Sequence, residues 1–226
     1  MSRWERVDSA EIPNNGGELS LFQRDDEYAI RIAGGQGDLM NSRTHGSEDA
    51  LGTLACESWR NTQGAQILIG GLGMGFTLAT ALQSLRADAQ VCVAELVPGV
   101  IAWNRELVGQ SAGSPLNDTR VSVKNIDVAE LINQASGTYN AIVLDVDNGP
   151  EGLTHPENDH LYSFAGLHAA YDALCPSGVL AVWSASPAPQ FKSRLRKVGF
   201  SVDERRVRAH RGKGSRHIIW LARRGA

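Results

Sequence analysis

From about residue 65 onward, short apolar runs alternate along the chain with segments of helical periodicity. In the helical segments the apolar residues recur at spacings of three and four, as Leu78, Ala81, Leu82 and Leu85 do. This pattern predicts five helices, over Phe76–Arg86, Pro98–Leu107, Val128–Gln134, Leu161–Leu174 and Gln190–Val198. It predicts seven strands, over Ile67–Ile69, Val91–Ala94, Val121–Lys124, Ala141–Leu144, Val179–Trp183, Ser201–Ala209 and His217–Ala222. Strands that are separated by helices favour a parallel sheet.

The last two predicted strands are connected in another way. Only the short basic segment Arg211-Gly-Lys-Gly-Ser215 stands between them, which leaves no room for a helix and predicts a hairpin. The last strand is therefore expected to be antiparallel. The sequence thus predicts an α/β fold with a doubly wound, seven-stranded and mostly parallel sheet.

The amino-terminal residues have a different pattern. Polar and apolar residues alternate over Glu18–Gln23 and over Tyr28–Ile32, with a turn signal between them, so a hairpin is expected there. We therefore expect two units, a small β appendage over residues 1–35 and a Rossmann-like domain over residues 36–226. The glycine-rich segment Gly34–Ser47 is expected to be a loop, with Ser47 capping a helix over Glu48–Trp59.

Composition narrows the class of protein. The chain has 226 residues and a formal net charge of −3, and it contains no apolar run of membrane-spanning length. Its three cysteines, Cys56, Cys92 and Cys175, are far apart and form no pair at metal-ligand spacing. We expect a cytoplasmic protein without a metal site, and no membrane partner.

Basic residues gather at the carboxyl-terminal end. From Gln190 onward there are twelve Lys and Arg residues but only Asp203 and Glu204 as acids. A solvated basic face explains this pattern without any partner, and it is the favoured interpretation. The alternative is a non-catalytic, nucleoside-binding pseudoenzyme whose basic tail holds an anionic partner through phosphate contacts; a nucleic-acid partner is not expected.

The strongest local signal is a cluster of glycines between the first strand and the first helix of the parallel pattern. Gly70, Gly71, Gly73 and Gly75 end the apolar run, and Glu95 ends the next run about twenty residues after the last glycine. Glycines allow the backbone to approach a ligand closely, and an acid at the second strand end accepts hydrogen bonds from ribose hydroxyls. The four glycines and Glu95 are therefore predicted to bind a nucleoside. A turn without a ligand is the alternative.

Further acids follow the third and fourth parallel strands. Asp127 is positioned to accept a hydrogen bond from an adenine amino group. Asp145 comes directly after Ala141–Leu144, and Asp147, two residues later, points the same way in an extended chain. Two close carboxylates raise the pKa of at least one of them, which suits a general base for an amine or a clamp for a cation. Asp145 and Asp147 are the predicted catalytic residues, and a helix cap or a loop hydrogen bond is the alternative for Asp145.

A long polar loop follows these acids and is expected to be a mobile lid. Residues 149–160 contain Glu151, which would attract a cationic substrate. His45 and Glu48 would face the ligand if the preceding glycine-rich loop folds over the crevice. These three residues are weaker candidates for contact with the substrate.

With these motifs, the chain resembles the polyamine aminopropyltransferases, the spermidine synthase family, and within it the short bacterial spermidine synthase-like proteins. Its seven-strand pattern is similar to that of class I S-adenosylmethionine-dependent methyltransferases. Residues 145–153 resemble the family's catalytic segment, and Thr44-His-Gly-Ser-Glu48 is a looser counterpart of its Tyr-His-Glu element. The resemblance implies that Glu95 binds ribose and Asp127 contacts adenine. It implies S-adenosylmethionine or its decarboxylated form as a substrate, a cationic amine as the partner, and no metal, and it leaves a homodimer open.

Three departures separate the chain from that family. The glycine loop of the family carries an acid where this chain has Gly73, the paired acids Asp145 and Asp147 stand two rather than three apart, and the amino-terminal β domain is short. Aminopropyl transfer to a polyamine is the first expectation. Methyl transfer to an unknown acceptor is the alternative, and intact S-adenosylmethionine is expected to enter the pocket.

Overall fold

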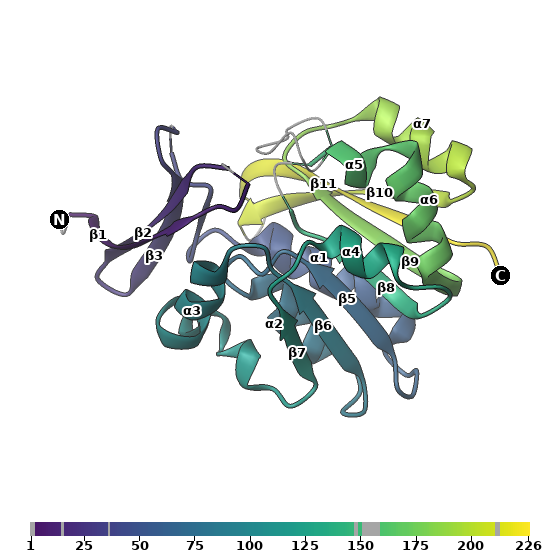
Figure 1. Ribbon diagram of the computed structural model, residues 1–226, viewed down its shortest axis with the longest axis horizontal. Helices are drawn as coiled ribbons and strands as arrows, with labels where there is room; N and C mark the ends of the chain where they lie inside the picture. Colours follow the sequence, from purple (N-terminus) through teal and green to yellow (C-terminus); the bar gives the residue numbers. More distant parts are fainter. Residues whose placement is uncertain (1–2, 15, 36, 147–148, 151–158, 211–212) are drawn as a thin grey trace.

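The computed structural model contains two β-sheets of different character (Figure 1). It describes residues 3–14, 16–35, 37–146, 149–150, 159–210 and 213–226. The larger sheet has seven strands in the order β10-β11-β9-β8-β5-β6-β7, and the smaller has four in the order β1-β2-β3-β4. Among the described residues no helix combines the length and hydropathy that a membrane span requires.

The large sheet confirms the predicted α/β fold. Its strands are β5 Gln66–Gly70, β6 Gln90–Ala94, β7 Val121–Lys124, β8 Tyr139–Leu144, β9 Leu174–Ser184, β10 Ser201–His210 and β11 Lys213–Arg223. Strands β7, β6, β5, β8 and β9 pair in parallel. Strand β11 is antiparallel to β10, as the short hairpin connection requires, and it is also antiparallel to β9.

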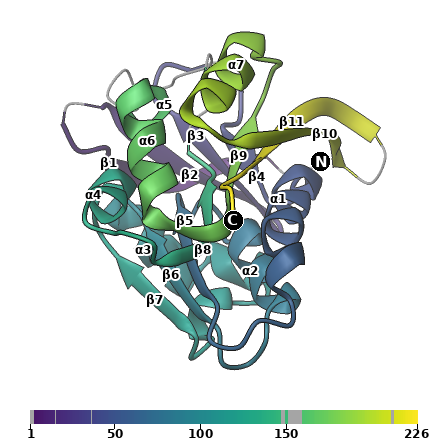
Figure 2. The same ribbon diagram turned by 90° about the vertical axis from the view of Figure 1, so that its right-hand side faces the viewer.

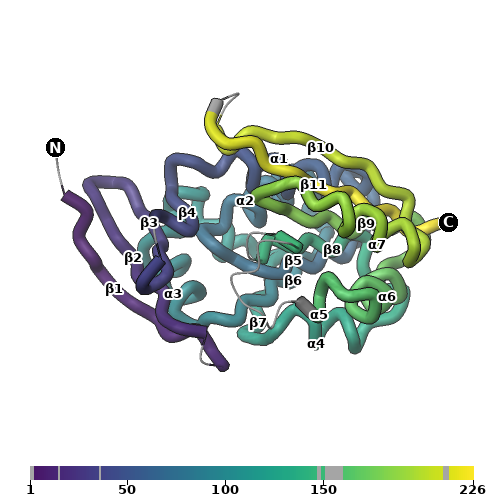
Figure 3. The backbone as a smooth tube through the Cα atoms, turned by 90° about the horizontal axis from the view of Figure 1, so that it is seen from above, coloured from purple at the N-terminus to yellow at the C-terminus, as the bar shows by residue number. Residues whose placement is uncertain are grey.

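Helices cover both faces of this sheet (Figure 2). They are α1 Gly46–Cys56, α2 Phe76–Ser84, α3 Pro98–Glu106, α4 Val128–Asn133, α5 Asp159–Tyr162, α6 Phe164–Ala173 and α7 Pro189–Val198, with 3-10 turns at Glu57–Trp59, Val108–Ala112 and Pro115–Asn117. Ile67 and Ile69 of β5 pack in the same cluster as α1 and α2, while Leu68 packs with α4, α6 and α7. This follows from the alternation of side chains along a strand. Seen from above, β10 and β11 lie alongside α1 (Figure 3).

Two predicted helices differ from those observed. The helix expected over Leu161–Leu174 is divided into α5 and α6, because Ser163 is non-helical and its side chain accepts a hydrogen bond from the Gly166 amide. Strand β9 then begins at Leu174. The prediction that Ser47 caps α1 is wrong. His45 occupies the cap position, but its side chain makes no capping bond to a backbone amide of the helix, and the Ser47 hydroxyl donates to the Glu48 carboxylate at 2.6 Å.

The small sheet packs against the side of α3 and the carboxyl edge of the large sheet (Figure 1). Its strands are β1 Glu5–Glu11, β2 Glu18–Arg24, β3 Glu27–Ile32 and β4 Met40–Asn41. The predicted hairpin is confirmed as β2 and β3, whereas β1 and β4 were not predicted, and β4 lies beyond residue 35. The indole N–H of Trp103 in α3 donates to Asp8 of β1 at 2.7 Å. A side chain at Gly99 would overlap Ala10, so α3 and β1 approach closely.

Candidate functional site

A cavity of about 190 Å³ lies at the carboxyl edge of the large sheet, under the small sheet. A single water needs only about 10–15 Å³, so the cavity can hold part of an organic molecule. The strand ends and the segments after them contribute Gly71, Leu72, Gly73, Met74, Phe76, Thr77, Ala94, Glu95, Leu96, Val97, Val100, Ile126, Asp127, Val128, Asp145, Val146 and Trp183. The small sheet and α1 contribute Ile12, Leu19, Ile30, Ile32, Leu39, Met40, Asn41 and Glu48.

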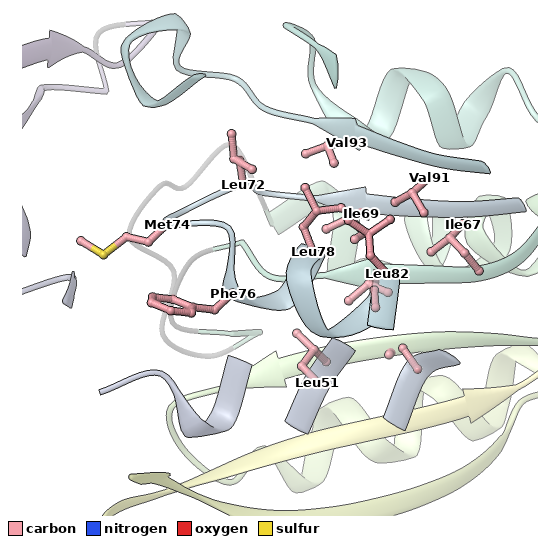
Figure 4. Close-up of a cluster of buried hydrophobic side chains, with 14 of the residues drawn as sticks. Leu51, Ile67, Ile69, Leu72, Met74, Phe76, Leu78, Leu82, Val91 and Val93 are labelled. Carbon is pink, nitrogen blue, oxygen red and sulfur yellow. The ribbon is translucent and has the colours of Figure 1, made fainter. Parts of the chain in front are cut away.

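The glycine loop after β5 forms one border of this cavity. Gly71 has a φ of 86°, and a side chain there would overlap the backbone oxygen of Asp145. Gly70 leaves room for Val128, whose side chain is within 2.9 Å of the place where a β-carbon would be, and Gly75 precedes α2 with a φ of 86°. Leu72, Met74 and Phe76 project from the loop, and Met74 points away from the strands (Figure 4). Glycines are therefore needed for close packing of the loop as well as for its turn.

Gly73 faces the small sheet. Its φ is 52°, and the sulfur of Met40 lies 3.2 Å from the position of a β-carbon. The Gly73 carbonyl accepts a hydrogen bond of 2.7 Å from the Asn104 side chain. Asn104 is a positioning residue that the sequence reasoning missed. The available signal was a polar residue on the buried side of an amphipathic helix, next to Trp103.

Glu95 connects the end of β6 to the glycine loop. Its carboxylate is buried, and its two oxygens accept hydrogen bonds of 2.8 Å from the backbone amides of Leu72 and Val97. Burial raises the pKa of Glu95, and these backbone bonds oppose that effect. Glu95 also lines the cavity, so its carboxylate lies within reach of a ligand hydroxyl.

Asp145 follows β8 and lies beside α2 and α1. The Thr77 hydroxyl donates to its carboxylate at 2.6 Å and is 3.3 Å from the Glu48 carbonyl oxygen. Burial raises the pKa of Asp145 to about 6, against the opposing effect of the Thr77 bond. Burial and the neighbouring charge of Asp145 raise the pKa of Glu48 to about 7. Thr77 was not predicted, although its place in the first turn after the last glycine was a signal.

Asp127 both caps a helix and lines the cavity. Its carboxylate accepts a hydrogen bond of 2.8 Å from the Ala129 amide at the start of α4. The His160 ring nitrogen lies 3.8 Å from the same carboxylate. The carboxylate therefore has a structural role already, and it remains close enough to the cavity to contact a ligand.

The remaining predicted residues have other positions. His45 is 2.8 Å from Asp49 and stacks on Phe76 at a ring distance of 3.9 Å. Although described, it is not one of the residues that line the cavity. Asp147 and Glu151, together with residues 152–158 of the predicted lid, lie outside the described residues.

The charges of the described lining residues all have one sign. Glu48, Glu95, Asp127 and Asp145 line the cavity, and no described Lys, Arg or His does. Such a cavity attracts cations. In the part of the chain that the structure describes, no three His, Cys, Asp or Glu side chains are grouped so as to hold a metal ion.

Residues 49–217 of the chain match the family model described as the spermine/spermidine synthase domain. Among curated proteins, none matches the chain.

Solved structures share the fold at low sequence identity. Spermidine synthase from Thermotoga maritima is 19% identical, with a TM-score of 0.74 over 99% of this chain and 75% of its own. A spermidine synthase in complex with the transition-state analogue AdoDATO is 17% identical, with a TM-score of 0.73 over 99% of this chain and 74% of its own. Burkholderia thailandensis 1,6-didemethyltoxoflavin-N1-methyltransferase, with bound 1,6-didemethyltoxoflavin and S-adenosylhomocysteine, is 18% identical, with a TM-score of 0.55 over 80% of this chain and 79% of its own.

Proposed function

Because this chain belongs to the spermine/spermidine synthase domain family, we propose that it transfers an aminopropyl group from decarboxylated S-adenosylmethionine to an amine. The observation that carries the proposal is the set of four carboxylates in the cavity, which no described basic lining residue offsets. The decarboxylated donor carries two positive charges, on sulfur and on its amine. Intact S-adenosylmethionine would bring an additional carboxylate into a cavity that is already acidic.

In this proposal the nucleoside lies along the strand ends. Glu95 accepts hydrogen bonds from the ribose hydroxyls, and Asp127 contacts the adenine amino group. Gly71 and Gly73 let the loop backbone approach the nucleoside. Gly70 allows Val128 to pack closely against the strand end, and Gly75 adopts the left-handed backbone at the turn into α2.

Asp145 is the proposed general base. The acceptor nitrogen attacks the carbon next to the sulfonium, a nitrogen–carbon bond forms, and the carbon–sulfur bond breaks with its electron pair moving to sulfur. Neutral methylthioadenosine leaves, and a proton of the acceptor nitrogen passes to Asp145. A pKa of about 6 leaves this carboxylate mostly ionised at neutral pH, so it can accept that proton. We propose that Asp147 assists, as its sequence position suggests.

Calorimetry with methylthioadenosine tests the nucleoside part of the proposal. Glu95→Ala removes a buried carboxylate acceptor and should weaken binding by about 1.5–3 kcal/mol. Glu130→Ala replaces an exposed glutamate of α4 and should leave the affinity unchanged. Absence of binding at millimolar concentration would contradict the nucleoside assignment.

Methyl transfer from intact S-adenosylmethionine is a second candidate. It is favoured by Gly73, because this position has no carboxylate that could bind the ammonium of the decarboxylated donor. The nearest side-chain atom to a β-carbon at Gly73 is the Met40 sulfur. An assay that offers both donors with a panel of amines, and measures methylthioadenosine and S-adenosylhomocysteine separately, distinguishes the reactions. Release of methylthioadenosine supports aminopropyl transfer, and release of S-adenosylhomocysteine supports methyl transfer. Nucleoside binding without either product supports the pseudoenzyme.

A further inference from the structure

The two sides of the cavity differ in polarity. On the side formed by the strand ends lie Glu95, Asp127 and Asp145, with Glu48 of α1 close to Asp145. The small sheet presents Asn41 and six aliphatic residues, which we call the aliphatic wall: Ile12, Leu19, Ile30, Ile32, Leu39 and Met40. No described residue of the aliphatic wall carries a charge.

The aliphatic wall continues onto the glycine loop and α3. Leu72 and Met74 of the loop and Val97 and Val100 next to it also line the cavity and are buried. Met40 contacts the loop at Gly73. A ligand group in this part of the cavity therefore meets hydrocarbon on the small sheet and on the loop that faces it.

An ammonium group and a hydrocarbon group would respond to this surface in opposite ways. An ammonium placed against the aliphatic wall would lose its hydration and would meet no carboxylate among the described residues of that wall, which is unfavourable. A hydrocarbon chain would leave water, and each buried methylene should increase affinity about fourfold. The aliphatic wall thus selects against a second cation.

The acidic side offers a place for one ammonium. Thr77 connects Asp145 to the backbone of Glu48, and the charge of Asp145 contributes to raising the pKa of Glu48 to about 7. Near neutral pH Glu48 is therefore partly protonated while Asp145 is mostly ionised, and the two carboxyl groups together carry between one and two negative charges. One ammonium between them offsets most of this charge.

We propose that the acceptor is a hydrophobic monoamine, with its ammonium at Glu48 and Asp145 and its alkyl or arylalkyl body against the aliphatic wall. This proposal rests on the proposed transfer function and names the class of its acceptor. The amine gives up its proton to Asp145 before or as its nitrogen bonds to the donor carbon, and sulfur leaves as the neutral thioether. The hydrocarbon body takes no part in the bond changes.

Calorimetry with two series of amines tests this inference on the full chain saturated with methylthioadenosine. Butylamine, hexylamine and octylamine should bind with affinity rising about fourfold per methylene, and hexylamine should bind at least tenfold more tightly than 1,6-diaminohexane. Equal or tighter binding of the diamine, or affinity independent of length, would overturn the proposal. If methylthioadenosine does not bind, the proposed function fails, and the same series on the protein alone still shows whether the cavity prefers a hydrophobic monoamine to a diamine.

A matched pair of variants tests whether the aliphatic wall contacts the acceptor. Leu39 is half-buried and lines the cavity. Leu39→Asp and Leu39→Asn introduce side chains of nearly equal size that differ in charge. Both should weaken hexylamine binding, and Leu39→Asp should bind 1,6-diaminohexane about tenfold more tightly than Leu39→Asn. Equal diamine affinities in two folded variants would overturn the proposed contact, and the amine series on the unmodified protein does not depend on either variant folding.

Discussion

The acidic strand ends and the aliphatic wall enclose one cavity but are built by different interactions. At the strand ends, each carboxylate is held by a short hydrogen bond: Glu95 by backbone amides, Asp127 by the start of α4, and Asp145 by Thr77. The aliphatic wall is held by packing of its buried members, and the hydrogen bond between Asp8 and Trp103 joins β1 of the same small sheet to α3.

This difference separates two tasks. Hydrogen-bonded carboxylates keep fixed positions, which proton transfer and nucleoside binding require. An apolar surface gives affinity in proportion to the hydrocarbon it covers and has little directional preference. We therefore expect changes at the strand ends to affect rate and backbone stability strongly, and changes at the small sheet to have smaller effects.

The largest effect is expected at Asp145. Asp145→Asn keeps the shape and removes the proposed base, so the rate of transfer should fall by about 10²–10⁴-fold. Methylthioadenosine affinity should change little. Thr77→Val removes the hydrogen bond without removing the carboxylate and should have a smaller effect on rate. Steady-state kinetics measure both variants, and a rate for Asp145→Asn within tenfold of the original would refute the assignment.

The next effect contrasts two glycines on the two sides of the loop. Gly71→Ala combines a left-handed backbone with overlap against the Asp145 backbone, so it should reduce the free energy of unfolding by about 2–4 kcal/mol. Gly73→Ala meets only the flexible Met40 side chain and should cost about 1 kcal/mol. Urea unfolding measures both. Similar losses of unfolding free energy in the two variants would mean that overlap with the Asp145 backbone adds no cost to the replacement of Gly71.

A smaller effect concerns pH. Glu48 and Asp145 have ordinary pKa values near 4 when unfolded, and the folded values are about 7 and about 6. Between these limits the folded protein binds more protons, so their contribution to stability is present at low pH and is lost as pH rises from about 4 to 7. Asp49 of the same helix also raises the pKa of Glu48, and the Ser47 hydroxyl bond lowers it.

Glu48→Gln should therefore make stability less dependent on pH, by about 1–2 kcal/mol between pH 5 and pH 8. Thermal melting of the ligand-free protein at several pH values measures the change. Glu57→Gln, at an exposed position just after the same helix, should leave the pH dependence as it is. An unchanged profile for Glu48→Gln would show that neither burial nor the charge of Asp145 raises the pKa of this residue.

The smallest effect is expected where the small sheet is attached. Asp8→Ala removes the acceptor of the Trp103 hydrogen bond and should lower stability by about 0.5–1.5 kcal/mol, with faster hydrogen exchange in β1. Asp8→Asn keeps an acceptor oxygen and should have less effect. If β1 exchanges at the original rate in Asp8→Ala, packing alone attaches the small sheet.

The sequence by itself determined the large sheet and the candidates at its edge. Short apolar runs between segments of helical periodicity predicted all seven strands, because the spacing of buried side chains along a strand or a helix is visible in the local sequence. The connection lengths predicted the parallel arrangement and the antiparallel last strand. Gly71, Glu95 and Asp145 could be identified because parallel strands bring their carboxyl ends to one edge in any order.

The tertiary structure decided which side chains meet. The Thr77 hydroxyl reaches Asp145 across 68 residues of sequence, and Asn104 reaches the Gly73 carbonyl across 31. Neither contact follows from local periodicity, because it depends on how α2 and α3 pack beside the strand ends. The small sheet covers the cavity through tertiary packing in the same way. The local pattern of residues 1–41 specifies only strands with one apolar face, and that face lines the site because it packs against distant segments of the chain.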